Sequence, residues 1–263
     1  MELDIFVVDA FTKEKFEGNS AAVVPLKEWL SAELMQKIAL ENNLSETAFI
    51  KAISSNKYEI RWFSPLMEID FCGHATLASS YVIFNHFNCQ REIEFVTLKV
   101  GSLYVNKDND NKIEMSFPNQ CPDLISDIPS EIINGLSLKP KKVLKNRQAY
   151  FAVMSSEDEV INITYNSEIL KQLAPFDVVV TAKSNEYDFI SRYFWPANGG
   201  DEDPVTGSIH SGLAPYWAKE LSKNKLVAYQ ASKRGGVLFC DVIEDRIMVS
   251  GFGVLYMQGK IYV

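Results

Sequence analysis

Glu46 is the residue in this sequence whose surroundings best suit proton transfer. It lies in the segment Asn43–Phe49, where a helical pattern ends and an apolar strand pattern begins. A carboxyl group among apolar neighbours binds a proton more readily than one in water, which suits a general acid or base. The same pattern also fits a carboxylate that only caps a helix or turns the chain, so both interpretations stand.

Two glycine-led helix starts supply candidate anion-binding groups, Gly73-His74 and Gly207-Ser208. The N-terminus of a helix presents N–H groups without intrahelical partners and the positive end of the helix dipole, and both attract carboxylates. We therefore predict that these four residues bind a substrate carboxylate. The structural alternatives are a packed histidine at His74 and a simple helix cap at Ser208.

Asp203 and Asn19 are two further candidates for substrate binding. Asp203 precedes Pro204, which favours an extended backbone just before the second glycine-led helix start. Asn19 follows Gly18 in a turn from which its amide could contact a ligand. Each residue has a structural alternative, because an acidic residue before a helix offsets the helix dipole and Gly-Asn turns are common.

Cys72 immediately precedes the first glycine-led helix start, a position that stabilises a thiolate. A racemase that uses two thiols as bases needs a second thiol at a matching position. The residue that matches Cys72, 134 positions further along the chain, is Thr206. The sequence therefore favours Cys72 as a small buried residue, and an epimerase that uses Cys72 stays as an alternative.

Composition excludes several classes of function. A formal net charge of −8 over 263 residues argues against nucleic-acid binding, which needs a basic face. No apolar run approaches the ~18 residues that span a membrane, and the start of the chain lacks the basic residues of a signal peptide, so we expect a cytoplasmic protein. The four cysteines and three histidines lack metal-ligand spacing, and no glycine-rich nucleotide fingerprint occurs. We therefore expect no metal and no cofactor.

The segments that must position these residues occur in two similar sets. Three pairs of segments match in order at offsets of 131 to 134 residues: Arg61–Pro65 with Arg192–Pro196, Phe71–Thr76 with Val205–His210, and Lys112–Ser116 with Arg246–Ser250. A repeat of this length indicates a duplicated domain and not a solenoid, whose period is ~20–50 residues. Clefts between domains commonly bind small molecules, so we expect the candidate residues to meet between the two halves.

The repeat divides the chain into two α/β half-domains, 1–118 and 119–263. Each is predicted to hold mainly antiparallel strands around one central helix, near 73–85 in the first half and near 207–221 in the second. Both helices are apolar on nearly every side, which indicates that protein surrounds them. The last predicted strand, over 253–256, can return to the first half.

Five segments in family order resemble the PhzF-like proteins, a family named for phenazine biosynthesis. They are Asp9–Asn19, Asn43–Phe49, Phe63–Pro65, Gly73–Leu77 and Glu202–Ser208. The resemblance implies the diaminopimelate-epimerase-like fold, in which each of two pseudo-symmetric halves wraps a strongly curved sheet around a central helix. It also implies a protein without cofactor or metal that forms a homodimer.

The resemblance further implies roles for individual residues. Glu46 matches the catalytic acid/base of the family, and His74, Asp203 and Ser208 match its other active-site positions. In the phenazine enzyme of the family, the reaction is an isomerisation of trans-2,3-dihydro-3-hydroxyanthranilate by a proton shift. One carboxyl group can remove a proton at one carbon and return it at another without a cofactor if the substrate is conjugated. The resemblance fixes this mechanism but not the substrate.

Three hypotheses follow for the function. The first is a cofactor-independent isomerase in which Glu46 moves a proton on a small carboxylated metabolite. The second is an amino-acid epimerase or racemase that uses Cys72. The third is a non-catalytic protein that retains the cleft and binds a ligand there.

Overall fold

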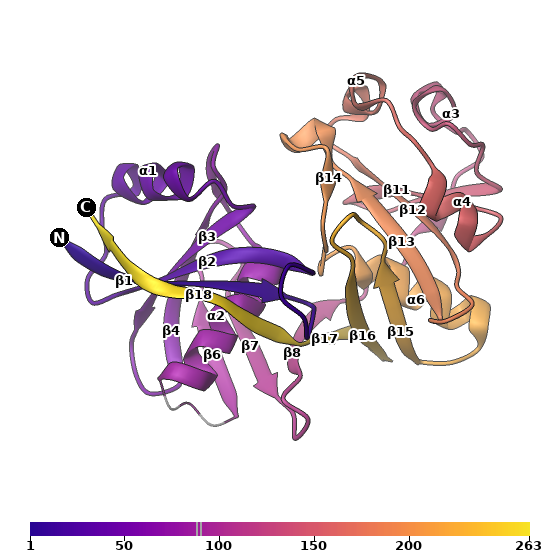
Figure 1. The fold of residues 1–263 in the computed structure, drawn as a ribbon. Coiled ribbons are helices and arrows are strands. Elements are labelled where there is room, and N and C mark those ends of the chain that lie inside the picture. Colours follow the sequence, from indigo (N-terminus) through magenta and orange to yellow (C-terminus); the bar gives the residue numbers. More distant parts are fainter. Residues whose placement is uncertain (88, 90) are drawn as a thin grey trace. The chain divides into compact units, whose positions relative to one another are not determined.

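The chain folds into two compact units in the computed structural model, which describes residues 1–87, 89 and 91–263 (Figure 1). The first unit combines Met1–Ser116 with Ser250–Val263, and the second consists of Phe117–Val249. The chain therefore leaves the first unit once and returns to it for its last strand.

The first unit is a mixed, mainly antiparallel sheet with two helices. Its elements are β1 (Glu2–Ala10), β2 (Asn19–Leu26), α1 (Ala32–Asn42), β3 (Glu46–Ala52), β4 (Lys57–Phe63), β5 (Glu68–Ile69), α2 (Gly73–His86), β6 (Glu92–Val96), β7 (Ser102–Lys107), β8 (Ile113–Pro118) and β18 (Gly253–Tyr262). β1 lies antiparallel to both β2 and β18, β2 runs parallel to β3, and β3 is antiparallel to β4. β4 is antiparallel to β5 and parallel to β6, which starts the β6-β7-β8 meander.

The second unit repeats this plan and adds short helices. Its elements are β9 (Asp123–Leu124), α3 (Ser130–Gly135), β10 (Lys142–Lys145), β11 (Ala149–Val153), α4 (Glu157–Asn162), α5 (Ser167–Leu170), η1 (Lys171–Leu173), β12 (Asp177–Lys183), β13 (Phe189–Phe194), η2 (Pro196–Asn198), β14 (Glu202–Asp203), α6 (His210–Leu221), β15 (Lys225–Gln230), β16 (Gly236–Ile243) and β17 (Arg246–Gly251). β11 is parallel to β12, β12 is antiparallel to β13, and β13 is antiparallel to β14 and parallel to β15.

The two units thus share one pairing scheme, in which β2, β3, β4, β5 and β6 correspond to β11, β12, β13, β14 and β15. A matching ion pair joins the third and fourth of these strands in each unit. Arg61 binds Glu68 in the first unit, and Arg192 binds Glu202 in the second, each with an Nε–Oε1 distance of 2.7 Å. The predicted fold of two similar α/β halves is confirmed.

The central helix α2 has no polar face. Its buried residues run without interruption from Gly73 to Ser80 and continue at Val82, Ile83 and Phe84. α2 packs against β1, β2, β3 and β18, so the sheet of the first unit bends around it (Figure 1). The hydroxyls of Ser79 and Ser80 donate to helix carbonyls one turn back, which leaves no polar group of theirs unsatisfied in this apolar surrounding.

The opposite face of the same sheet is covered by α1. Ser31 caps this helix by accepting a hydrogen bond from the N–H of Leu34. Met35 and Phe49 are among the residues of the resulting core, whose buried members are Ile5, Ala22, Val24, Leu26, Met35, Ile38, Ala39, Phe49 and Phe63. Because both faces of β2 are buried, this strand is apolar along most of its length.

The central helix of the second unit begins later than the repeat predicts. α6 starts at His210, whereas the expected start was Gly207. The intervening residues form tight turns, in which the N–H groups of His210, Ser211 and Gly212 donate to carbonyls three positions back. These bonds span three residues where an α-helix spans four, so 207–209 form a 3₁₀-like turn before the helix. α6 itself packs against β15 and β16.

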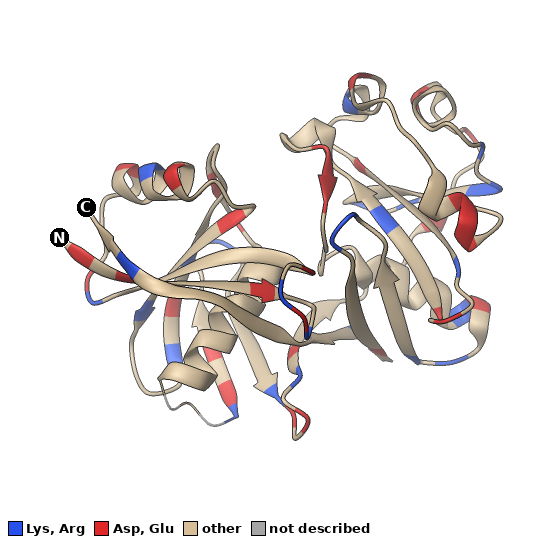
Figure 2. Ribbon diagram, viewed as in Figure 1, with Lys and Arg blue, Asp and Glu red and all other residues tan. Residues whose placement is uncertain are grey.

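Charged residues are dispersed over both units, with Lys and Arg interspersed among Asp and Glu (Figure 2). Among the residues that the structure describes, no helix is long and apolar enough to cross a membrane.

His210 generates a prediction about acid stability. The imidazole is fully buried, its Nδ1 donates to the carbonyl of Thr206 at 2.9 Å, and burial lowers the pKa of His210 to about 4. An unfolded histidine titrates near 6.5, so below that pH the unfolded chain binds a proton that the folded chain excludes. We expect this group to lower the free energy of unfolding by about 3 kcal/mol between pH 6.5 and 4, and to add no further loss below pH 4.

Urea unfolding across this pH range would check the expectation. His210→Asn keeps a donor for Thr206 and removes the titrating ring, so its stability should fall less steeply with acidification. His86→Asn, at the exposed end of α2, is the matched control and should retain the wild-type slope. Equal slopes for wild type and His210→Asn would contradict the assignment.

Candidate active site

Four of the candidate residues of the first unit meet at the start of its central helix. Glu46 is the first residue of β3, Asn19 is the first residue of β2, and Cys72 and His74 lie at the beginning of α2. The parallel pairing of β2 with β3 sets Glu46 opposite Ala21, close to Asn19. α2 packs against both strands, which positions His74 beside them.

His74 is the centre of this cluster. Its Nε2 lies 2.8 Å from Oε2 of Glu46, and its Nδ1 lies 3.1 Å from the amide nitrogen of Asn19. The sulfur of Cys72 lies 3.5 Å from the same Nδ1. All four residues are less than 8% exposed, so these polar contacts are formed away from bulk water. Because a side-chain amide can turn either its oxygen or its nitrogen toward Nδ1, Asn19 can form a hydrogen bond with both the neutral and the charged imidazole.

The protonation states of the cluster follow from its burial. Burial disfavours a charged imidazole, but attraction to Glu46 and hydrogen bonds to Cys72 and Glu46 raise the pKa of His74 well above its usual range. Burial, reinforced by the Glu46 carboxylate, raises the pKa of the Cys72 thiol to about 11. Cys72 is therefore protonated at neutral pH.

The start of α2 offers backbone donors beside this cluster. Cys72 occupies the N-cap position, and its side chain makes no capping hydrogen bond. Within the described ranges of the chain, no acceptor contacts the N–H groups of Gly73 and His74. Because the dipole of this helix of 14 residues adds to these donors, the position suits a carboxylate.

In the second unit, Asp203 belongs to a tightly held loop. Its carboxylate accepts a hydrogen bond from the hydroxyl of Thr206. Gln230, which is fully buried in β15, accepts from the N–H of Thr206 at 2.9 Å and donates to the carbonyl of Asp203 at 2.8 Å. The loop that precedes Gly207 is thereby fixed at both ends.

Ser208 is joined to a network that the sequence analysis missed. Gln148 donates from its side-chain nitrogen to the hydroxyls of Ser208 and Tyr193, both at 3.0 Å. Tyr193 in turn donates to Asp177 at 2.5 Å. Two signals for these residues were present in the sequence: Tyr193 lies in the repeated Arg192–Pro196 segment, and Asp177 begins an apolar strand as Glu46 does. No local motif distinguishes Gln148.

The structure therefore brings Glu46, His74 and Asn19 together in the first unit, next to Gly73. Asp203 and Ser208 belong to the second unit, where a tight turn at Gly207–Ile209 precedes α6. The convergence of the two groups on one substrate, expected from the repeat, stays a prediction.

Glu46, Cys72 and His74 are also the residues that could hold a metal ion. Each offers one atom of a type that zinc binds, and these atoms lie within 4.8 Å of one another. Metal binding would need a Cys72 thiolate and an unprotonated nitrogen on His74. With the Cys72 pKa near 11 and a proton held between His74 and Glu46, the cluster fits proton transfer better than metal binding.

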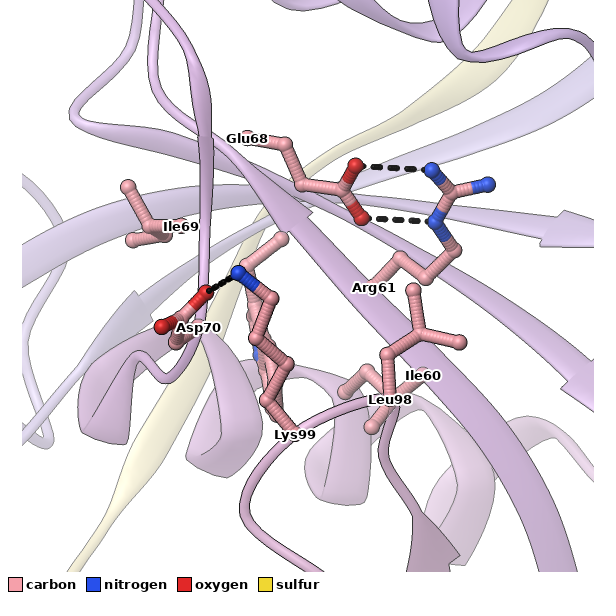
Figure 3. A pocket seen from close by; sticks show the side chains of 8 residues that line it. Ile60, Arg61, Glu68, Ile69, Asp70, Leu98 and Lys99 are labelled. Carbon is pink, nitrogen blue, oxygen red and sulfur yellow. Dashed lines mark hydrogen bonds and ion pairs between the residues drawn. The ribbon is translucent and has the colours of Figure 1, made fainter.

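A small pocket also opens on the first unit (Figure 3). It is lined by Ile60, Arg61, Trp62, Glu68, Ile69, Asp70, Leu98 and Lys99. Its charged groups are paired with each other, since Arg61 forms two 2.7 Å hydrogen bonds to Glu68 and Lys99 lies 3.0 Å from Asp70 (Figure 3). Neither Glu46 nor His74 lines this pocket, so we do not assign the proton chemistry to it.

Comparison with known proteins identifies relatives over the whole chain. The family described as Phenazine biosynthesis-like protein (PhzC-PhzF) matches residues 8–259. A protein of Halalkalibacterium halodurans named as an uncharacterized isomerase is 43% identical over 265 residues, covering 99% of each chain. A Pseudomonas aeruginosa protein with the same designation is 42% identical over 263 residues, covering 100% of each chain.

Solved structures agree with the sequence comparison. A phenazine biosynthesis protein of the PhzF family from Enterococcus faecalis superimposes with a TM-score of 0.95 at 41% identity, over 100% of each chain. A hydroxyproline epimerase from Agrobacterium vitis superimposes with a TM-score of 0.62 at 10% identity, over 99% of this chain and 92% of the other, and shares the fold alone. The expected epimerase-like fold is confirmed.

The raised pKa of Cys72 predicts low thiol reactivity. A shift from 9.0 to about 11 reduces the thiolate fraction at neutral pH roughly a hundredfold, and burial shields the sulfur further. Cys89 and Cys240 are also buried, whereas Cys121 is exposed. Mass spectrometry of the native protein treated with iodoacetamide should show rapid labelling of Cys121 alone.

Cys121→Ser is the control for this experiment and should leave no rapidly labelled thiol until the protein is unfolded. Rapid labelling of Cys72 in the folded protein would show a stabilised thiolate and would revive a thiol-based mechanism.

Proposed function

This chain belongs to the phenazine biosynthesis-like family, and we propose that it is a cofactor-independent isomerase in which Glu46 moves a proton on a small carboxylated metabolite. The observation that carries the proposal is the buried contact of 2.8 Å between Glu46 and His74 at the start of α2. Two curated relatives at 43% and 42% identity carry the name isomerase, which supports the reaction class.

The proposed reaction needs one base that later acts as an acid. Glu46 takes a proton from one carbon of a conjugated substrate, the electron pair moves through the adjacent double bond, and Glu46 returns the proton to a second carbon. His74 contacts Oε2 of Glu46, so we assign Oε1 to the substrate proton. The protonated imidazole beside the site stabilises the negative charge that develops on the substrate.

We propose that the start of α2 and the turn before α6 hold the substrate carboxylate. The N–H groups of Gly73 and His74 supply donors in the first unit, and Asn19 orients the imidazole. From the second unit, Asp203, Gly207 and Ser208 are proposed to bind the same substrate. Members of the family differ in substrate, so trans-2,3-dihydro-3-hydroxyanthranilate is the first compound to assay and not an assigned substrate.

An epimerase that uses Cys72 is the less favoured alternative. Its two-base mechanism needs two thiols, and the position that matches Cys72 is Thr206. Thr206 donates its hydroxyl to Asp203 and forms part of the fixed loop, which is a structural role. The protonated state of the Cys72 thiol argues in the same direction.

We also propose that the protein acts as a homodimer, as the family resemblance implies, and that it acts in the cytoplasm. Light scattering coupled to size-exclusion chromatography would test the assembly. A mass of one chain, 29.7 kDa, across the working concentration range would contradict the dimer.

The role of Glu46 leads to the central prediction. Glu46→Gln keeps the side-chain volume but cannot take up a proton, so turnover and solvent deuterium wash-in should fall by roughly 10²–10⁴-fold. Ligand affinity and thermal stability should change little. The assay is deuterium incorporation from D₂O over a panel of cyclic and amino-acid carboxylates, followed by mass spectrometry.

Cys72→Ala is the matched control, because it removes a buried group that contacts the same imidazole. It should leave wash-in within a few-fold of wild type. An inactive Cys72→Ala with an active Glu46→Gln would assign the protein to the thiol epimerases instead.

Carboxylate binding at the start of α2 is a separate prediction. Titration with 3-hydroxyanthranilate, a stable aromatic carboxylate that keeps the ring substituents of the family substrate, should shift the amide NMR signals of Gly73 and His74. The N-terminus of α1 begins at Ala32 after a serine cap and is the internal control, since its first donors are partly satisfied. Unchanged signals at Gly73 and His74 in a saturated complex would contradict this binding mode.

A further inference from the structure

Asp177 is the counterpart of Glu46 in the second unit. Glu46 is the first residue of β3 and pairs with Ala21 of the parallel strand β2. Asp177 is the first residue of β12 and pairs with Ala149 of the parallel strand β11. The two acids are 131 residues apart, as are Pro65 and Pro196 in the repeated segments. The strand register and the sequence offset therefore both identify Asp177 as the counterpart of Glu46.

Ser208 is likewise the counterpart of His74, since each is the second residue of its Gly73-His74 or Gly207-Ser208 pair. In the first unit the acid contacts its partner directly, at 2.8 Å between Glu46 and His74. In the second unit the connection from Asp177 to Ser208 passes through Tyr193 and Gln148. Asp177 therefore occupies the same strand position as Glu46, but two side chains separate it from Ser208.

The short contact between Tyr193 and Asp177 sets the direction of the hydrogen bonds. Two oxygens 2.5 Å apart must share a proton, and the exposed Asn198 already donates to the other oxygen of Asp177 at 2.8 Å. With Asp177 ionised, the single hydroxyl proton of Tyr193 is committed to it. The Tyr193 oxygen can then only accept, and the group that donates to it is the side-chain nitrogen of Gln148 at 3.0 Å.

This direction continues to Ser208. The second N–H of the Gln148 amide donates to the Ser208 hydroxyl oxygen at 3.0 Å. Because that oxygen accepts from Gln148, the Ser208 proton points elsewhere, and no acceptor for it lies within the described part of the chain. Ser208 is partly exposed, so the proton is available to a ligand.

The geometry of the network is rigid. Tyr193 is 4% exposed and Asp177 is 8% exposed, so neither can exchange its partner for water freely. The backbone of Gln148 is bound at both ends, since its N–H donates to Asn146 at 2.8 Å and its carbonyl accepts from the N–H of Asp177 at 3.2 Å. The side-chain amide of Gln148 is thus held next to Ser208 in one orientation.

We propose that Asp177, Tyr193 and Gln148 are positioning residues that leave the Ser208 hydroxyl proton free to donate, so that the preferred ligand group at Ser208 is a hydrogen-bond acceptor. A carboxylate, carbonyl or enolate oxygen accepts this proton, whereas an ammonium or amidinium group can use only the remaining lone pair of the hydroxyl oxygen and leaves the proton without an acceptor. The inference rests on the proposed function, in which Ser208 binds the substrate, and it narrows the chemistry of the substrate group at that position.

A double-mutant cycle on ligand binding tests the proposal. The probe is 3-hydroxyanthranilate, and affinity is measured by calorimetry for wild type, Gln148→Leu, Ser208→Ala and the double variant. Each single substitution should weaken binding about 10- to 150-fold, the size of one hydrogen bond to a charged group. The double variant should bind no more weakly than Ser208→Ala, because Gln148 acts only through Ser208.

Tyr216→Phe is the matched control, since it removes a buried tyrosine hydroxyl from α6 in the same unit but outside the network. It should bind as wild type does. If Gln148→Leu does not fold, Tyr193→Phe replaces it, because loss of the tyrosine oxygen frees the Gln148 amide to rotate. Benzamidine, an amidinium of similar shape, serves as the donor-only probe, and its binding should depend on Ser208 less than binding of the carboxylate does.

Four results would overturn the proposal. They are equal effects of Gln148→Leu with and without Ser208, an affinity for the carboxylate that Ser208→Ala leaves unchanged, benzamidine binding that Ser208→Ala weakens as much as it weakens carboxylate binding, and no saturable binding of the carboxylate by wild type. The proposed function is tested separately, because deuterium wash-in by Glu46→Gln is measured on turnover and not on this equilibrium.

Discussion

The burial of α2 on every side is the constraint on which the first unit depends. Eleven of its fourteen residues are buried, so the helix is stable only where a sheet bends around it. The surrounding strands β1, β2, β3 and β18 then fix where the helix begins. Because Glu46 opens β3 and His74 lies at the helix start, the packing of an apolar helix holds two polar side chains at 2.8 Å.

The two units show how one arrangement can acquire two chemical roles. In the first, an acid and an imidazole touch, and both are close enough to exchange a proton. In the second, a tyrosine and a glutamine separate Asp177 from Ser208, and each link in that chain has a fixed donor and acceptor. In the proposed mechanism, the same strand and helix positions thus provide a mobile proton in one copy and a static hydrogen-bond donor in the other.

The sequence predicted the parts of the site that lie in short motifs and missed those that depend on strand register. Glu46, His74 and the start of α2 stand in local patterns with clear chemistry. Gln148 comes close to Ser208 only after β11 pairs with β12, and no local pattern reports that pairing. α6 was expected at Gly207 because a glycine suits a helix start, but 3₁₀-like hydrogen bonds displace it to His210. The short elements α3 and β10 were also missed, since four to six residues carry little periodicity.

The pairing of β1 with β18 sets the order in which the two units can complete their sheets during translation. All of the second unit, Phe117–Val249, is translated after β1 and before β18. The second unit can therefore complete its sheet while the first still lacks an edge partner for β1. During that interval β1 exposes unpaired backbone groups over nine residues, a strand edge open to wrong pairing on the ribosome. The first unit, whose synthesis begins first, is thus the unit whose sheet is completed last.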